Sequence, residues 1–276
     1  MRMTKQLPMK IKLFTMALAA SVLVACEETE LGEGAYDGEI ALSEQFVENE
    51  AAFLNTYTIV DLAMRNDDLL ANDSVTIDGA AVTMVGANLV IDYGQGVLGA
   101  DGQMRKGTLN VLVNGDYKTI GMLTVDMSNY TLKEMKASGS MEITNYNLDS
   151  ITLSSTEFSV NTMKLVANKT LTWKSGFGTP SADDDLFQLM GSAWGTDSSG
   201  VNSIAIATSE RLEYDAKCAH KMVSGIFDLS FDIDSVADNN SGSLDFINSD
   251  GCNNLIKVTV DKGESSFSTT QQFSGF

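Results

Sequence analysis

The stretch TLNVLVNGDYKTIGMLTVDM, residues 108–127, decides the fold class. Apolar and polar residues alternate in TLNVLV and again in MLTVDM, which is the period of a half-buried β-strand. Asn114-Gly115 follows the first run, and this dipeptide is typical of a two-residue type I′ hairpin turn. We therefore predict an antiparallel hairpin with its turn at Asn114-Gly115.

Similar alternating runs, rich in Val, Ile, Thr and aromatic residues, recur through residues 73–276 between turns of Gly, Asn, Asp and Ser. No apolar pattern of helical length separates them, which excludes parallel βαβ units. We predict a mainly β fold, as an antiparallel sandwich, an open barrel or a large curled sheet. Two places share an apolar-Asp-aromatic run before a Gly/Asp turn, so the domain can comprise two related β modules, about 73–170 and 171–276.

The only helical pattern lies in residues 39–72, where apolar residues recur at intervals of three, four or seven. Acidic residues such as Glu50 and Asp61 lie mostly off this stripe. The pattern predicts an amphipathic helical segment that packs one face on the sheet, with a break near Asn55-Thr56. The apolar stripe is Leu42, Phe46, Phe53, Tyr57, Val60 and Met64.

Gly94, Gly96 and Gly99 match the glycine spacing of a dinucleotide-binding loop. Such a loop must open a helix whose N-terminus holds the pyrophosphate. Here the turn dipeptide Asp101-Gly102 and a strand follow instead. We interpret the three glycines as a hairpin connection, and the sequence gives no indication of a cofactor.

Residues 1–25 have the pattern of a secretory signal peptide, with a basic start and a short apolar run. They end in Leu23-Val24-Ala25, and Cys26 completes a lipobox, so we predict that Cys26 carries lipid and anchors the chain to a membrane. The acidic, glycine-containing residues 26–38 are expected to form a tether.

The chain is acidic, with a formal net charge of −19 that becomes more negative once the basic residues 1–25 are removed. Repulsion from phosphate makes nucleic acid an unsuitable partner. The acidity favours solubility, with calcium affinity as the alternative. With Cys26 committed to lipid, Cys218 and Cys252 remain as an even pair, for which we predict a disulfide, with two buried free thiols as the alternative.

Few residues suggest a catalytic or ligand site. His220 is the only histidine, which leaves little material for a triad or a typical zinc site. The densest acidic cluster is Asp183, Asp184 and Asp185, and it lies between Trp173 and Trp194. These five residues are the candidate ligand or calcium loop, since carboxylates bind calcium and aromatic rings stack on sugars. A solvated turn with core-packed aromatics is the structural alternative.

Several of these segments, including IDYGQGVLGADGQMRKGTLNV, KTLTWKSG and CAHKMVSGIFDLSF, resemble uncharacterised lipoproteins common in Bacteroidota. The resemblance covers roughly residues 40–262, and its most specific part is a D-G-x-x-R-K-G turn at Asp101–Gly107. Relatives carry cysteines near the positions of Ser74 and Val97, which this chain lacks. The resemblance implies an outer-membrane location but no activity, and acidic residues after the lipidated cysteine, here Glu27-Glu28, imply display at the cell surface.

These observations favour a lipid-anchored envelope protein with a non-enzymatic structural or interaction role. One alternative is a binding module that holds a small apolar or glycan ligand inside a curled sheet. A second is a carboxylate-dependent hydrolase, which requires two carboxylates facing each other across a cleft. An envelope protein or a glycan is a possible partner, and the sequence leaves the oligomeric state open.

Overall fold

The computed structural model describes most of the chain from Glu33 onward. The described residues are 33–117, 119–146, 150–160, 162–176, 179, 181, 184–218, 222–234, 236–247, 252–253 and 255–272. The predicted signal peptide, Cys26 and most of the predicted tether therefore lie outside the described residues, as do Asp183 and His220.

The strands form one antiparallel 16-stranded sheet in which neighbours along the chain are mostly neighbours in the sheet. The short strand β4 pairs only with β5, and β8 fills the space between β6 and β9. The strands are β1 (Ser74–Ile77), β2 (Ala80–Val85), β3 (Asn88–Asp92), β4 (Val97–Leu98), β5 (Met104–Asp116), β6 (Ile120–Leu132), β7 (Met135–Ser138), β8 (Ser140–Tyr146), β9 (Ser150–Val160), β10 (Met163–Ser175), β11 (Leu186–Thr196), β12 (Ser203–Asp215), β13 (Met222–Ile233), β14 (Val236–Phe246), β15 (Leu255–Lys262) and β16 (Ser265–Gln272).

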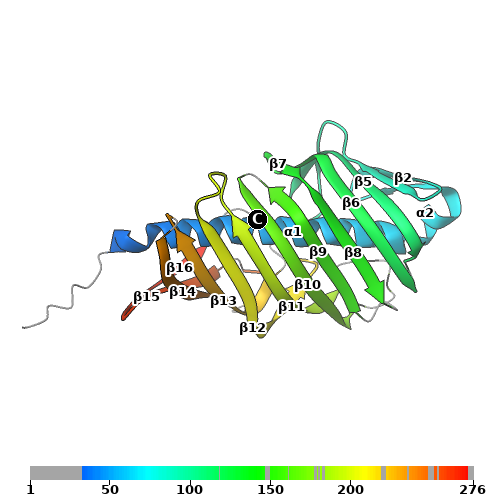
Figure 1. Ribbon diagram of the computed structural model, residues 1–276. Helices are drawn as coiled ribbons and strands as arrows, with labels where there is room; N and C mark the ends of the chain where they lie inside the picture. Colours follow the sequence, from blue (N-terminus) through cyan, green and yellow to red (C-terminus); the bar gives the residue numbers. More distant parts are fainter. Residues whose placement is uncertain are drawn as a thin grey trace, which may run out of the picture. The chain divides into compact units, whose positions relative to one another are not determined.

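The sheet curls around one long helix, α1 (Asp37–Arg65), which follows the short 3-10 helix η1 (Glu33–Tyr36) and precedes the short helix α2 (Asp67–Asn72). Figure 1 shows α1 running lengthwise behind the obliquely crossing strands. Of its 29 residues, 21 are buried, including every residue from Asn49 to Asp61. The mainly β, antiparallel prediction is confirmed, and the curled sheet is the form that fits a helix whose residues are all buried from Asn49 to Asp61.

The predicted arrangement of α1, with one apolar face on a sheet and its acids elsewhere, is wrong in one respect. Glu50 and Asp61, which were expected off the buried stripe, are 0% and 2% exposed. Each has a basic partner inside the molecule, Lys169 for Glu50 and Arg65 for Asp61. Charge pairing thus permits carboxylates on a helix face that hydrophobic periodicity alone assigns to solvent.

The predicted break near Asn55-Thr56 is absent, because α1 is continuous through these residues. The amide of Asn55 donates to the carbonyl of Ala51 (3.0 Å), and the Thr56 hydroxyl donates to the carbonyl of Ala52 (2.9 Å). Each polar side chain therefore finds its acceptor one turn back on the same helix, and it can be buried without interrupting the backbone.

The acidic residues Glu39, Glu50 and Asp61 stand at equal intervals of eleven residues along α1. Three helical turns take about 10.8 residues, so the three carboxylates lie along one side of the helix. Lys262 from β15 binds Glu39 at 2.8 Å, and Lys169 from β10 lies 3.1 Å from Glu50. We call these three residues and their basic partners the charge ladder. Its Glu39 and Glu50 pairs hold α1 against two strands that are far apart along the chain.

The hairpin predicted over residues 108–127 is present, but its turn is displaced. Gly115 pairs with Gly121 inside the β5–β6 ladder, and the turn follows Asp116 instead of forming at Asn114-Gly115. Tyr117 explains the shift, because its ring is buried and its hydroxyl donates to Asp61 on α1 at 2.6 Å. A tertiary contact therefore overrides the local turn preference.

The connection from β3 to β5 contains Gly94 and Gly96, with φ of 54° and 143°, and leads into β4 rather than a helix. The interpretation as a hairpin connection is confirmed. In the following turn, the guanidinium of Arg105 is 1% exposed and forms two bonds to Asp101, of 2.8 and 2.6 Å. At Gly107, φ is +79° and an added Cβ would lie 1.8 Å from the carbonyl oxygen of Asn129.

Candidate functional site

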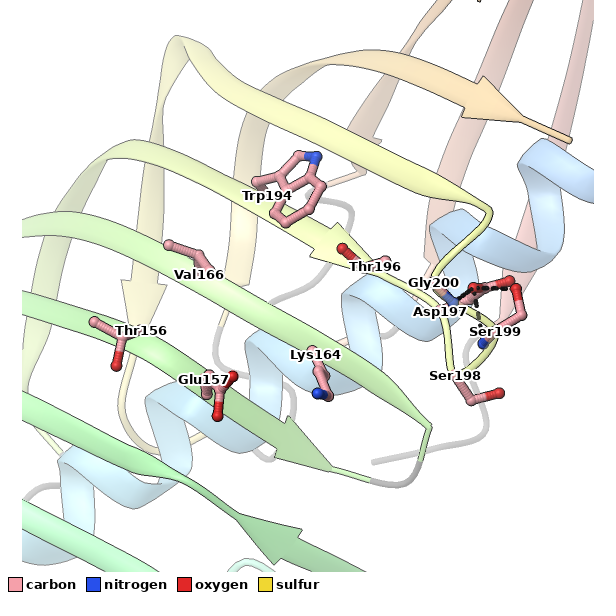
Figure 2. Close-up of a pocket in the computed structure, with 10 residues that line it drawn as sticks. All are labelled: Thr156, Glu157, Lys164, Val166, Trp194, Thr196, Asp197, Ser198, Ser199 and Gly200. Atoms are coloured by element: carbon pink, nitrogen blue, oxygen red, sulfur yellow. Dashed lines mark hydrogen bonds between the residues drawn. The ribbon is translucent and has the colours of Figure 1, made fainter. Parts of the chain in front are cut away.

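The outer face of the sheet carries a pocket of about 390 Å³ where β9, β10 and β11 lie side by side (Figure 2). We call it the Trp194 pocket. Its lining consists of Thr156 and Glu157 from β9, Lys164 and Val166 from β10, Trp194 and Thr196 from β11, and the turn formed by Asp197, Ser198, Ser199 and Gly200.

The alternation of β11 turns Trp194 outward, because Ala193 and Gly195 on either side face the interior. Its cross-strand neighbours are Val166 on β10 and Ala205 on β12. Trp194 remains 48% exposed and Val166 41% exposed. A large aromatic ring thus lies open beside small or branched apolar neighbours, an arrangement that offers contact area to a ligand.

The turn at one end of the pocket is held in shape by Asp197. Its Oδ1 accepts hydrogen bonds from the backbone N–H groups of Ser199 (3.1 Å) and Gly200 (2.9 Å), and its Oδ2 accepts one from the Asn202 amide (2.7 Å). Desolvation opposes ionisation, but these hydrogen bonds prevail and lower the pKa of Asp197. The ionised carboxylate therefore gives the pocket a pre-formed wall at neutral pH.

Both signs of charge occur at the rim. Glu157 and Lys164 are exposed side chains from adjacent strands, and Thr156 and Ser198 add exposed hydroxyls. The hydroxyl oxygen of Thr196 is buried and has no hydrogen-bond partner among the described residues. The pocket thus combines an apolar floor with polar groups of both donor and acceptor type.

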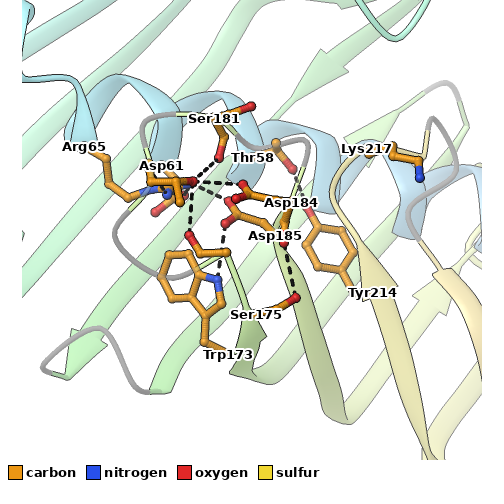
Figure 3. Close-up of polar contacts among 12 residues, drawn as sticks. Thr58, Asp61, Arg65, Trp173, Ser175, Ser181, Asp184, Asp185, Tyr214 and Lys217 are labelled. Carbon is orange, nitrogen blue, oxygen red and sulfur yellow. Dashed lines mark hydrogen bonds and ion pairs between the residues drawn. The ribbon is translucent and has the colours of Figure 1, made fainter.

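Two other candidate residues, Asp185 and Trp173, lie together at the end of α1 (Figure 3), where Asp185 is buried and Trp173 is half-buried. Arg65 binds Asp185 and also Asp61, with 2.8 Å between its Nε and the Asp61 Oδ2. Trp173 donates from its indole N–H to Asp185 at 3.3 Å, and the Arg65 guanidinium lies 5.0 Å from its ring centroid. We call this group, with Tyr117, the Arg65 cluster.

Burial governs the acid–base properties of the Arg65 cluster. Desolvation raises the pKa of Asp185 to about 6, although Arg65 acts in the opposite direction. It also raises the pKa of Asp61, against the effects of Arg65 and of the Tyr117 hydrogen bond. Both carboxylates are 2% exposed and share one guanidinium. Because both carboxylates are buried and paired, we assign this cluster to the packing of the end of α1.

The structure divides the predicted ligand loop. Asp185 is buried and Trp173 is half-buried against the core, whereas Asp184 is exposed and accepts a 2.8 Å hydrogen bond from the Thr179 hydroxyl. Trp194 lies on the outer face, and Asp183 is outside the described residues. Within the described part of the chain, no group of three or more His, Cys, Asp or Glu side chains is placed to hold a metal ion. Calcium binding remains an untested prediction.

The predicted disulfide between Cys218 and Cys252 is confirmed, with 5.1 Å between the Cα atoms. It joins the loop after β12 to the loop before β15. His220 and Cys26, the predicted lipidation residue, both lie outside the described residues.

Sequence reasoning missed the buried charges at Glu50, Lys169 and Arg105. One signal was available for the helix, the eleven-residue interval of its acids, which matches three turns. For Lys169 the available signal was alternation, since β10 places it between the inward residues Ala167 and Leu171.

Comparison with protein-family models, with curated proteins and with solved structures found no match. Among the helices that the structure describes, none has the length and apolar character of a membrane-spanning segment.

Proposed function

We propose that this chain is a lipid-anchored envelope protein that acts by binding a partner on the outer face of its sheet, without catalysis. The lipobox residues Leu23-Val24-Ala25-Cys26 support the anchor, as does the resemblance to Bacteroidota lipoproteins. The resemblance and Glu27-Glu28 support an outer-membrane location, with the cell surface preferred.

The observation that carries the binding role is the exposure of Trp194 in its pocket, with 48% of the side chain open to solvent. Near α1, the described side chains of Phe46, Phe53 and Tyr57 pack at 0–1% exposure. This packing argues against a ligand held inside the curled sheet and favours the outer surface.

The short tether adds a geometric consequence to the proposal. Six residues lie between Cys26 and Glu33, the first described residue, and the seven residue-to-residue steps between these two span at most about 25 Å when extended. Lys262 binds the Ala35 carbonyl at 2.6 Å, so η1 is fixed to β15. A lipid at Cys26 would hold the η1 and β15 end close to the membrane.

The anchor is tested by metabolic labelling of cells with an alkyne fatty acid, comparing the wild-type chain with Cys26→Ser. We expect label and membrane retention in the wild type and loss of both in the variant. An unlabelled wild-type chain, or a Cys26→Ser chain that still takes up the label, would contradict the anchor.

The binding role is tested with the released Cys26→Ser chain, by co-sedimentation with isolated cell envelopes. Trp194→Ala in this background should weaken binding at least fivefold. Leu112→Ala is the matched control, since Leu112 is an apolar residue 54% exposed on the outer face of β5, in a separate pocket. Equal binding by both variants would exclude the Trp194 pocket as the binding surface.

A further inference from the structure

We infer that the Trp194 pocket binds a neutral glycan, with one sugar ring stacked on the indole of Trp194. The inference deepens the proposed function, on which it rests, by naming the ligand class of the same pocket. It differs from the expectation of a ligand enclosed by the sheet, because the pocket lies on the outer surface (Figure 2).

The floor of the pocket fits the apolar face of a sugar ring. Trp194 offers a broad ring beside Val166, and its other cross-strand neighbour, Ala205, is too small to cover it. The C–H groups on one face of a pyranose pack against an aromatic ring, while its hydroxyls point sideways. A strand-borne tryptophan with open neighbours provides such a platform without any rearrangement.

The rim fits the hydroxyls of the same ligand. Sugar hydroxyls both donate and accept, so they are best matched by a rim of mixed character. Glu157 supplies an acceptor, Lys164 supplies a donor, and Thr156 and Ser198 supply groups that do both.

Charge argues against the other ligand classes. A phosphate or polyanion would meet a single cation, Lys164, between the carboxylates of Glu157 and Asp197, on a chain of net charge −19. A fatty acyl chain would place its methylene groups among these same exposed charges, which costs desolvation. A neutral, hydroxyl-rich ligand avoids both penalties.

Size and rigidity agree with a short glycan segment. The volume of about 390 Å³ lies near the lower end of the range for small-molecule pockets, roughly 300–1,000 Å³. The floor is carried by paired strands, and Asp197 fixes the turn through its hydrogen bonds to Ser199 and Gly200. Binding therefore requires little ordering of the protein.

The test uses tryptophan emission, since Trp173 and Trp194 are the only tryptophans. In the full chain with Cys26→Ser and Trp173→Phe, emission reports on Trp194 alone. It is titrated with neutral cellohexaose and N-acetylchitohexaose, with oligogalacturonate as the anionic probe and decanoate as the apolar probe. We expect a saturable change with at least one neutral oligosaccharide and none with the other two.

Calorimetry on Trp173-containing protein provides the same comparison should Trp173→Phe fail to fold. Trp194→Ala should weaken neutral-glycan binding at least tenfold, Glu157→Gln severalfold, and the control Leu112→Ala not measurably. Each variant is first checked for an unchanged urea midpoint.

The inference is overturned if neither neutral oligosaccharide binds, if Trp194→Ala leaves binding intact, or if only oligogalacturonate or decanoate binds. Its failure is distinguishable from failure of the proposed function. If the chain sediments with envelopes in a Trp194-dependent way but binds no glycan, the outer face is still the binding surface, and only the glycan is excluded as its ligand.

Discussion

The carboxylate of Glu50 and the ammonium group of Lys169 lie 3.1 Å apart, and neither side chain is exposed to solvent. Neither group has a hydrogen-bond partner among the described residues. The ammonium group lies 4.5 Å from the ring centroid of Phe227 and 5.8 Å from that of Phe46. This middle pair of the charge ladder is therefore held by charge and by aromatic faces.

Removing one member of this pair is expected to be more costly than removing both. Glu50→Gln leaves the Lys169 charge buried and uncompensated, which should lower the free energy of unfolding by about 3–5 kcal/mol. The double change Glu50→Leu with Lys169→Met should recover much of that loss. Urea unfolding measures both, with Glu44→Gln, an exposed residue of the same helix, as the control. If Glu50→Gln is as stable as Glu44→Gln, the Glu50–Lys169 pair contributes nothing to the free energy of unfolding.

The raised pKa of Asp185 predicts a particular pH dependence. Its folded-state pKa of about 6 exceeds the value of about 3.9 for an unfolded aspartate, so the folded chain takes up this proton first. As the pH falls from 7 to 4, the wild type should gain about 1–2 kcal/mol of stability relative to Asp185→Asn. The measurement is the difference in unfolding free energy across this range. A difference that stays constant or shrinks on acidification would refute the shift.

Two glycines provide a matched test of backbone contact. Gly107 and Gly102 both have positive φ, of +79° and +75°, so alanine meets a similar backbone penalty at each. Only at Gly107 would the new Cβ lie 1.8 Å from a backbone oxygen, that of Asn129. Gly107→Ala should therefore cost at least about 2 kcal/mol more than Gly102→Ala. Thermal unfolding measures the loss of stability in each variant. Equal losses would mean that the paired backbones of β5 and β6 move apart at little cost to make room for the new Cβ.

The disulfide closes a loop with a sequence separation of 34 between Cys218 and Cys252. Replacing both cysteines with alanine should lower the free energy of unfolding by about 2–4 kcal/mol, because the unfolded chain regains its freedom. Comparing urea midpoints with and without reductant gives an independent measure, since the reductant should affect only the wild type. Identical midpoints for all four samples would contradict a stabilising bridge.

Much of the sheet could be predicted from alternation, because strands such as β6 and β10 bury one face and expose the other. The β5–β6 turn could not, since its position depends on the contact of Tyr117 with Asp61 on a distant helix. The burial of α1 was also missed. An acidic residue is normally assigned to solvent, and only a partner such as Lys169, which no local pattern connects to Glu50, permits its burial.

The candidate site shows the same limit. The sequence singled out Trp194, but grouped it with Trp173 and Asp185 because they are near along the chain. The sheet separates them, since Trp173 faces inward on β10 and Trp194 faces outward on β11. Residues such as Glu157 and Lys164 join Trp194 only through strand pairing, which single-sequence patterns do not reveal.

The position of α1 has a consequence for the order of folding. The helix is made before every strand, yet Glu39 in its first turns depends on Asn240 of β14 and Lys262 of β15, which are made only after most of the strands. Contacts of such long sequence separation form slowly, because much chain must be ordered before they contribute. We therefore expect the first turns of α1 to stay exposed to solvent until β15 has been made and has paired. A chain cut short before β15 would then expose this part of the helix instead of folding as a smaller domain.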